Sequence, residues 1–256
     1  MEPLTSSDLA AVEQLLSSHS VPADLVTVKS NPRAKRLIFK ASLKKGVEII
    51  VPKDKDSLWI IDTVASKISW IKSTRKHVRD GRSQLKPATI SLKALDENWS
   101  VQYTEHKPAT NKLTLNGDHS LSITTDSKDP FRSARQLQQW FHQRAKLSLL
   151  PWISSLAEER NLKFNRIYIK NQVSRWGSCS MKRNINLNRN MLFIPHHLVE
   201  YVLHHELTHL EHLDHSDRFW TAFTHVLPNC GELRRELRQL ELTDTPLWAS
   251  PRLEKL

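Results

Sequence analysis

Residues 203–215 (LHHELTHLEHLDH) hold five histidines and two glutamates, and they constrain the fold more than any other stretch of the chain. Within them, residues 205–209 read HExxH. On a helix, positions i and i+4 lie on one face about one turn apart, so both imidazoles can bind one Zn²⁺ at about 2.0–2.1 Å. The glutamate beside the first histidine can reach a metal-bound water as general base. The pattern therefore predicts a zinc site, with His205 and His209 as ligands and Glu206 as base.

Apolar residues flank this pattern, so we expect the helix that carries it to be buried. Pro195 opens the segment, and the spacing of its apolar residues predicts a helix over 195–213. A buried pair of histidines without a ligand is unfavourable, because its polar nitrogens lose their contact with water. Burial therefore favours a metal site over two histidines that only fill the core.

A tetrahedral zinc ion with one open position needs a third protein ligand. His215 follows the second histidine by six residues, which is the histidine spacing of the HExxHxxGxxH motif, provided that the helix ends near His212. His212 stands where that motif has glycine, and it would enter a left-handed turn at a conformational cost. Glu232 or Glu236, on a later helix, is an alternative. His212 itself is the weakest candidate, because seven helical residues rise about 10 Å. We expect His215.

The other histidines and acidic residues of this region are expected to have supporting or structural roles. His204 points about 100° away from the first ligand on a helix. Glu211 and Asp214 are expected to be solvated or to accept a hydrogen bond from the distal N–H of a ligand. The histidines without ligand spacing are expected to be structural or surface residues: His196, His197 and His225.

A loop that reads RWGSCS, starting at Arg175, precedes the predicted helix. Gly177 indicates a tight backbone, and Trp176 indicates a buried anchor. Arg175 would stabilise an oxyanion or bind a substrate carboxylate, or else form an ion pair that holds the loop to the catalytic helix. Cys179 would be a fourth zinc ligand or a small buried residue, and we favour the second interpretation.

Hydrophobic patterning predicts an α+β fold in two parts. We expect residues 1–128 to form a β-rich N-terminal region with one long helix, and residues 129–256 to form a catalytic domain with a small sheet. Asn116-Gly117 predicts a two-residue hairpin turn. The expected elements are helices at 8–18, 56–78 and 217–226, a helix from residue 129 that Pro151 kinks or splits, a hairpin at 35–52, and strands at 88–92, 99–105, 113–124, 166–170, 185–188 and 191–194.

Composition limits the classes of partner. The chain has 38 Lys and Arg against 27 Asp and Glu, a net charge of +11 that is spread evenly. This charge permits binding to nucleic acid, although a solvated basic surface is the simpler explanation. The two cysteines, Cys179 and Cys230, form no disulfide framework. Neither a signal peptide nor a run of roughly 18 apolar residues is recognisable. We therefore expect a cytoplasmic protein without a membrane partner.

Four segments together resemble the YgjP-like metallopeptidases, which are distant relatives of the SprT-like and WLM proteases within the zincins. The segments are RWGSCS at 175–180, INLN at 185–188, HHLVEYVLHHELTHLEHLDHSDRFW at 196–220 and LPNCGELRREL at 227–237. The resemblance covers residues 165–237 closely and 26–79 more loosely. It implies a zincin-like catalytic domain with Zn²⁺ as cofactor, bound by His205, His209 and His215, with Glu206 as base.

The leading hypothesis is zinc-dependent hydrolysis of a peptide or protein substrate, in which Glu206 moves the proton from a metal-bound water to the leaving amine. Tyr201 or Arg175 would stabilise the tetrahedral oxyanion, and a sheet edge near 185–194 would hold an extended peptide. Two alternatives remain open. One is a nucleic-acid-associated protein, either a DNA-linked protease or a factor with a structural metal site, although no known nucleic-acid-binding motif is present. The other is hydrolysis of a non-peptide amide.

Overall fold

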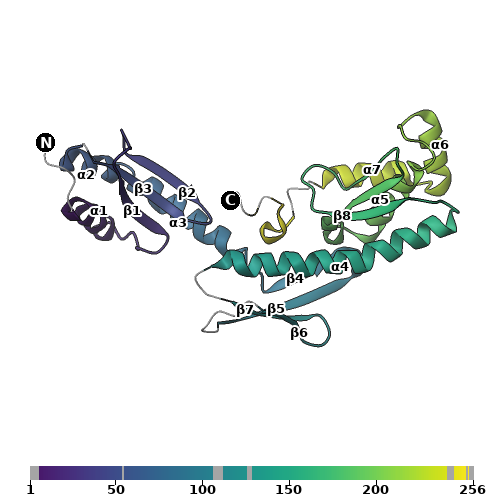
Figure 1. Cartoon of the computed structure of the whole chain (residues 1–256), viewed down its shortest axis with the longest axis horizontal. Helices are drawn as coiled ribbons and strands as arrows, with labels where there is room; N and C mark the ends of the chain where they lie inside the picture. The colour runs from purple at the N-terminus through teal and green to yellow at the C-terminus, as the bar shows by residue number, and fades with distance from the viewer. Residues whose placement is uncertain are drawn as a thin grey trace. The chain divides into compact units, whose positions relative to one another are not determined.

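The computed structural model divides into two compact units, Met1–Gln84 with Glu254–Leu256, and Leu85–Leu253 (Figure 1). The structure describes residues 6–53, 55–105, 112–125, 129–240, 245–251 and 253. The predicted boundary at residue 128 falls inside the second unit, because the strands that precede it pack against the helix that follows it. Helices combined with small mixed sheets confirm the predicted α+β class.

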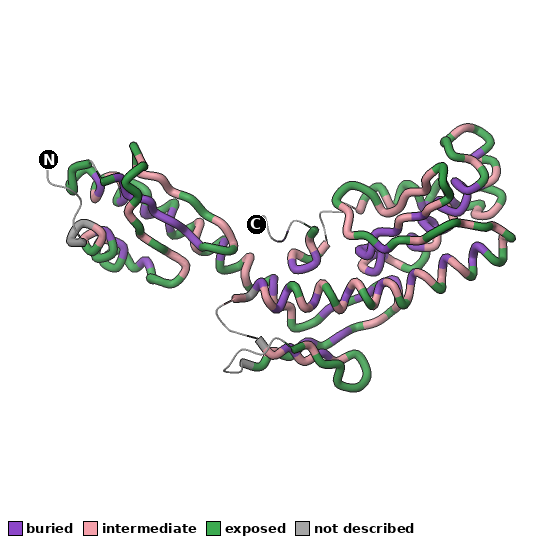
Figure 2. The backbone as a smooth tube through the Cα atoms, viewed as in Figure 1, coloured by how far each residue is buried: buried purple, intermediate pink, exposed green. Residues whose placement is uncertain are grey.

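The first unit contains a mixed sheet of order β1-β3-β2. β3 (Gly46–Pro52) is buried along its whole length, as its β-branched sequence favours, and it lies between the other two strands. β1 (Val26–Asn31) runs parallel to β3, and β2 (Ile38–Ser42) forms the predicted hairpin with it. The predicted N-terminal helix is α1 (Ser6–Ser18), which packs Val12 into the same core. Figure 2 shows this buried strand in the middle of the sheet.

The single helix predicted over 56–78 is wrong, because the structure has two helices there. These are α2 (Ser57–Ala65) and α3 (Ile68–Ser83). The N–H of Lys67 bonds to the carbonyl oxygen of Val64 at 2.9 Å. This i→i+3 bond closes α2 in a tight turn before α3 begins. The apolar repeat continues across the break, so periodicity alone does not reveal it.

The second unit begins with a sheet of order β4-β5-β7-β6, in which the central pair runs parallel. Its strands are β4 (Thr89–Leu92), β5 (Glu97–Glu105), β6 (Lys112–Leu115) and β7 (Ser120–Thr125), with the 3₁₀ turn η1 (Lys93–Leu95) between the first two. The predicted hairpin joins β6 and β7 but has a longer loop, because the N–H of Asn116 bonds to the carbonyl oxygen of Ser120. Gly117 and His119 in this loop both have positive φ angles, of 61° and 54°.

α4 (Pro130–Glu159) is the longest helix and lies along this sheet (Figure 1). Asp129 caps it, because its carboxylate accepts a hydrogen bond from the N–H of Phe131 at 3.0 Å. Pro151 does not split the helix, which continues through it. Buried residues recur every three or four positions along α4 (Figure 2): Ala134, Leu137, Phe141, Ala145, Leu149 and Ile153.

A second sheet, of order β8-β10-β9, adjoins the helix that carries HExxH. β8 (Arg166–Lys170) and the central strand β10 (Asn184–Asn188) lie where strands were predicted, and they run parallel to each other. β9 (Gly177–Cys179) pairs antiparallel with β10 in a segment that was predicted to be a loop. β10 is therefore no edge strand, and the sheet edge expected near 185–194 belongs instead to β9.

The strand predicted at 191–194 is wrong, because residues 189–193 form the 3₁₀ helix η2 (Arg189–Phe193). The side chain of Asn188 accepts a hydrogen bond from the N–H of Asn190 at 3.1 Å and turns the chain there. The apolar residues of η2 still enter the core, and the ring of Phe193 stacks on that of Phe141 of α4.

Three helices follow and form the functional region. α5 (His196–Thr208) carries the first histidine of the HExxH pattern and ends earlier than residue 213. α6 (Asp217–Val226) has the predicted bounds, and α7 (Cys230–Gln239) follows it. The 3₁₀ turn η4 (Leu247–Ala249) packs on α4. Within the described residues, no helix combines the length and the apolar character needed to cross a membrane.

Gly46 in the first unit allows a close approach of two backbone segments. A Cβ atom there would lie 2.3 Å from the carbonyl oxygen of Leu25, and the φ angle of Gly46 is +79°. Gly117 also has a positive φ, of +61°, but a Cβ there would meet no atom within 4 Å. The two glycines therefore separate the effect of backbone conformation from that of steric contact.

We expect Gly117→Ala to lower the free energy of unfolding by about 1–2 kcal/mol, the conformational cost alone. Gly46→Ala should lower it by about 1–3 kcal/mol more, because the backbone must also shift. Urea unfolding followed by circular dichroism measures both values. Equal losses for the two variants would show that the contact with Leu25 is unimportant.

Candidate metal centre

Three imidazole side chains meet at the C-terminal end of α5. Nε2 of His205 lies 3.2 Å from Nε2 of His209 and 3.0 Å from Nε2 of His215. All three ligand atoms lie within 4.8 Å of one another. A tetrahedral ion that binds nitrogens at about 2.0–2.1 Å holds them about 3.3 Å apart. The spacing of the three nitrogens therefore fits a single bound metal ion.

The position of His215 depends on how α5 ends. After Thr208 the chain tightens, since the N–H of Leu210 bonds to the carbonyl of Leu207 and the N–H of Glu211 bonds to that of Thr208. These i→i+3 bonds end the helix and turn the chain back toward the metal centre. The left-handed turn expected at the glycine position of the motif does not form, because His212 keeps a negative φ angle.

His212 contributes to the centre through its backbone. Its carbonyl oxygen lies 2.9 Å from Nδ1 of His209 and accepts the hydrogen bond from that nitrogen. This contact fixes the tautomer of His209, because a proton on Nδ1 leaves the lone pair of Nε2 facing the other two histidines. The imidazole of His212 is not part of the group that converges.

The glutamates considered as third ligands lie elsewhere. Glu236 of α7 contacts His197, with 2.8 Å between its Oε1 and Nε2 of the histidine. Glu232 is exposed in the first turn of α7. In the described parts of the chain, the His triad is the one group of His, Cys, Asp and Glu atoms close enough to share an ion. Cys179 is outside it, and burial raises the pKa of its thiol to about 11.

The acidic residues after α5 organise the turn and do not contact the imidazoles. Glu211 forms an ion pair with Arg160, the C-cap residue of α4, with 3.1 Å between oxygen and nitrogen. Arg160 also donates to Oγ1 of Thr208 at 3.2 Å. Asp214 accepts a hydrogen bond from the hydroxyl of Ser216 at 2.7 Å, just before α6. These contacts fix both ends of the segment that delivers His215.

An aromatic wall from α6 supports the three histidines. The ring centroid of Phe219 lies 5.0 Å from that of His205, 4.6 Å from that of His209 and 4.8 Å from that of His215. Phe219 is fully buried. Trp220 adds a stacked contact with His215, at 5.8 Å between centroids. Sequence reasoning gave Phe219 no role, although the Phe-Trp pair belongs to the segment that carries the family resemblance.

Glu206 lies next to the histidines and faces β9. Its side chain is buried, and burial raises the pKa of its carboxyl group to about 8, against the lowering effect of Arg175. A Cβ atom on Gly177 would lie 2.5 Å from Oε1 of Glu206. The glycine of the RWGSC segment is thus required because the carboxylate occupies the space where any other side chain would begin.

Asn188 holds the loop before β9 in place. This fully buried residue at the end of β10 donates from Nδ2 to the carbonyl oxygens of Gln172 and Arg175, at 3.0 and 2.9 Å. Its backbone N–H bonds to the carbonyl oxygen of Trp176 at 2.8 Å. Asn188 belongs to the INLN segment, but the sequence alone indicates no role for it, because its partners are distant in sequence.

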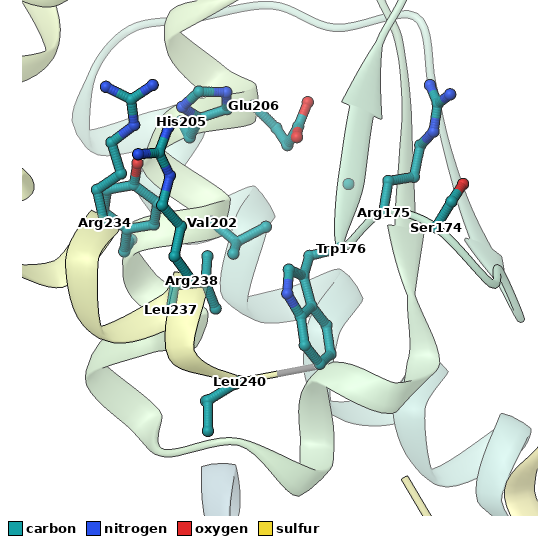
Figure 3. A pocket seen from close by; sticks show the side chains of 12 residues that line it. Ser174, Arg175, Trp176, Val202, His205, Glu206, Arg234, Leu237, Arg238 and Leu240 are labelled. Atoms are coloured by element: carbon teal, nitrogen blue, oxygen red, sulfur yellow. The ribbon is translucent and has the colours of Figure 1, made fainter. Parts of the chain in front are cut away.

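The two residues predicted to stabilise an oxyanion lie differently. Tyr201 is buried one turn before His205 and stacks on it, with ring centroids 6.0 Å apart. Burial raises the pKa of Tyr201, while the charges of Arg234 and Arg238 lower it. Arg175 is exposed, and its guanidinium points away from His205 and Glu206 (Figure 3). Its side chain forms no ion pair with any residue that the structure describes, so Asn188 rather than an ion pair holds this loop.

A cavity of about 410 Å³ opens beside His205 and Glu206 (Figure 3). The loop before β9, α5 and α7 contribute its walls. Besides the residues of the metal centre, the side chains that line it include Trp176, Val202, Arg234, Leu237, Arg238 and Leu240. A substrate in this cavity would therefore lie against both the carboxylate of Glu206 and the imidazole of His205.

The sequence model of the YgjP-like metallopeptidase domain matches residues 35–240. The chain belongs to the YgjP-like family, which confirms the resemblance inferred from the four segments and extends it over most of both units. Membership makes the chain a metallopeptidase-domain protein, for which peptides or proteins are the substrate class. The comparison with curated proteins finds no match.

The contact between Gly177 and Glu206 predicts a selective loss of activity in Gly177→Ala. The new Cβ must displace the carboxylate, and a displacement of about 1 Å is expected to lower kcat/KM about 100-fold. Metal content should stay unchanged, because Gly177 does not contact the histidines. Cleavage of denatured casein and elemental analysis measure both quantities.

Gly231→Ala is the matched control, since a Cβ at Gly231 in α7 would meet no atom within 4 Å. This variant should keep its activity. If Gly177→Ala also kept full activity, the position of Glu206 would not depend on the glycine.

Proposed function

We propose that the chain is a zinc-dependent peptidase in which His205, His209 and His215 hold the ion. The convergence of three Nε2 atoms beside a buried carboxylate carries this proposal. Burial lowers the pKa of His205 to about 3 and also lowers that of His209. Both imidazoles are therefore neutral, which is the form that binds metal ions. When bound, a zinc ion supplies Lewis acidity, which lowers the pKa of water and polarises a peptide carbonyl.

Glu206 acts as general base in this proposal. Its Oε2 atom is buried without a hydrogen-bond partner among the described residues, so it is available as an acceptor. The carboxylate takes a proton from the attacking water and passes it to the nitrogen of the leaving amine. The raised pKa of Glu206 favours both steps, because a base whose pKa lies close to the working pH accepts and returns a proton readily.

Tyr201 is the better placed of the two candidates for stabilising the oxyanion. Its ring is held against His205 by stacking, and the raised pKa keeps its hydroxyl protonated as a donor. We assign Arg175, whose guanidinium points away from the centre, an electrostatic influence on Glu206.

The free edge of β9 is the proposed binding site for an extended peptide. β9 pairs with β10 on one side, and no strand of the described chain pairs with its other side. Because Gly177 in β9 contacts Glu206, a peptide added to this edge would pass the catalytic carboxylate. The alternative of nucleic-acid binding finds no support in the described structure beyond the net charge, and we do not propose it.

Glu206→Gln should abolish proteolysis while zinc stays bound. The amide keeps the shape of the side chain but cannot accept the proton, and loss of a general base typically costs about 100- to 10,000-fold in rate. Casein cleavage and zinc analysis on the same preparation test this. Unchanged cleavage by zinc-loaded Glu206→Gln protein would overturn the proposed role.

His215→Ala and His212→Ala form a matched pair of variants, because each removes one imidazole from the short segment between α5 and α6. Loss of a residue that only contacts a metal ligand typically weakens metal affinity about 10- to 100-fold. Loss of His215, a proposed ligand itself, should weaken zinc affinity by more than this. His212→Ala should bind zinc normally, because its carbonyl oxygen remains available to His209. Chelator competition measures the affinities, and the zinc-induced rise in Tm provides a second measure. The reverse order would exclude His215 as third ligand.

A further inference from the structure

Two arginines of α7 line the cavity beside the metal centre. Arg234 and Arg238 are spaced i,i+4, so they lie on one face of the helix, and both reach the cavity on the side of His205 (Figure 3). The guanidinium carbon of Arg234 lies 4.5 Å from the ring centroid of Trp220, the same ring that stacks on His215. Arg234 is thus tied to the metal centre through a cation–π contact.

Neither guanidinium has an acidic partner in the part of the chain that the structure describes. Glu236, on the same helix, is occupied by His197 at 2.8 Å. Like charges at i,i+4 repel each other, so the pair does not stabilise α7 by itself. A bound anion would relieve this repulsion. Three arginines and one glutamate are the charged residues that line the cavity, which favours an anionic ligand.

The rest of the cavity wall is largely apolar. Trp176, Val202, Leu237 and Leu240 line it below the two arginines (Figure 3). An apolar wall with a cationic side fits an amino-acid residue that ends in a carboxylate, because the methylenes contact the apolar surface and the acid meets the guanidinium groups. Arginine binds carboxylates through paired N–H donors, which gives strong and directional recognition.

We propose that Arg234 and Arg238 form a subsite that binds a carboxylate of the peptide substrate close to the bond that is cleaved. This inference rests on the proposed peptidase function and specifies its substrate class. The carboxylate belongs either to an Asp or Glu side chain or to a free C-terminus. Both present the same chemistry to the two arginines, and the experiment separates them.

The test measures peptide binding without cleavage. Zinc-loaded Glu206→Gln protein is titrated into four fluorescein-labelled peptide pools, in which the central residue is Glu or Gln and the C-terminus is an acid or an amide. The remaining positions are random mixtures of Ala, Ser, Gly and Leu. We expect pools with the preferred carboxylate to bind about 10- to 100-fold more tightly than the fully neutral pool, the usual range for a hydrogen bond to a charged group. The preference should fall as salt is added.

The same titrations are repeated with Arg234→Gln and Arg238→Gln, singly and together, in the Glu206→Gln background. The double variant should lose the preference for the carboxylate but keep its affinity for the neutral pool. Arg235→Gln is the matched control, because Arg235 is an exposed arginine of α7 that does not line the cavity. This control should keep the preference.

Equal binding of acidic and neutral pools, or a preference that persists in the double variant, would overturn the inference. Failure of the proposed function would give a different result. In that case, wild-type protein would contain no zinc and would cleave no peptide. A preference for the internal Glu pool would assign an acidic side chain, and a preference for the free acid would assign the C-terminus.

Discussion

The contact between α5 and β9 is the constraint on which the functional region depends. Glu206 is buried at the point where the two elements approach, and the missing side chain of Gly177 makes room for its carboxylate. Asn188 keeps β9 there by bonding three backbone groups of the preceding loop. The carboxylate is therefore held by packing and not by a charged partner, which leaves one of its oxygens available for chemistry.

The same region shows how a candidate metal site can be assembled from one short stretch of chain. His205 lies in the last turn of α5 and His209 is its C-cap residue, and His215 arrives only because the helix stops at Thr208. Arg160, the C-cap residue of α4, fixes that stop by contacting Thr208 and Glu211. Phe219 then packs against all three imidazoles, so the segment between α5 and α6 is held from both sides.

Sequence reasoning predicted the local parts of this arrangement well. The HExxH spacing and the six-residue step to His215 follow from helix geometry and motif length, and the cap Asp129 follows from local hydrogen bonding. Sequence reasoning missed the features that depend on contacts between residues distant in sequence. β9 has only three residues and is recognisable only through its pairing with β10, and the role of Asn188 requires loop carbonyls that no pattern locates. The break between α2 and α3 was missed for a different reason, because the apolar repeat continues across it.

The net charge of the chain does not indicate a ligand by itself, whereas the positions of particular charged side chains do. A net charge of +11 spread evenly along the sequence does not discriminate between nucleic acid, another polyanion and a solvated surface. Arg234 and Arg238 are two of those charges, yet they lie in a cavity that also exposes the proposed catalytic carboxylate. There they would meet a bound group at contact distance, which is shorter than the Debye length of about 8 Å at physiological ionic strength. In the proposed subsite, a local excess of arginine beside the candidate metal centre would bear on substrate choice more strongly than the whole-chain balance.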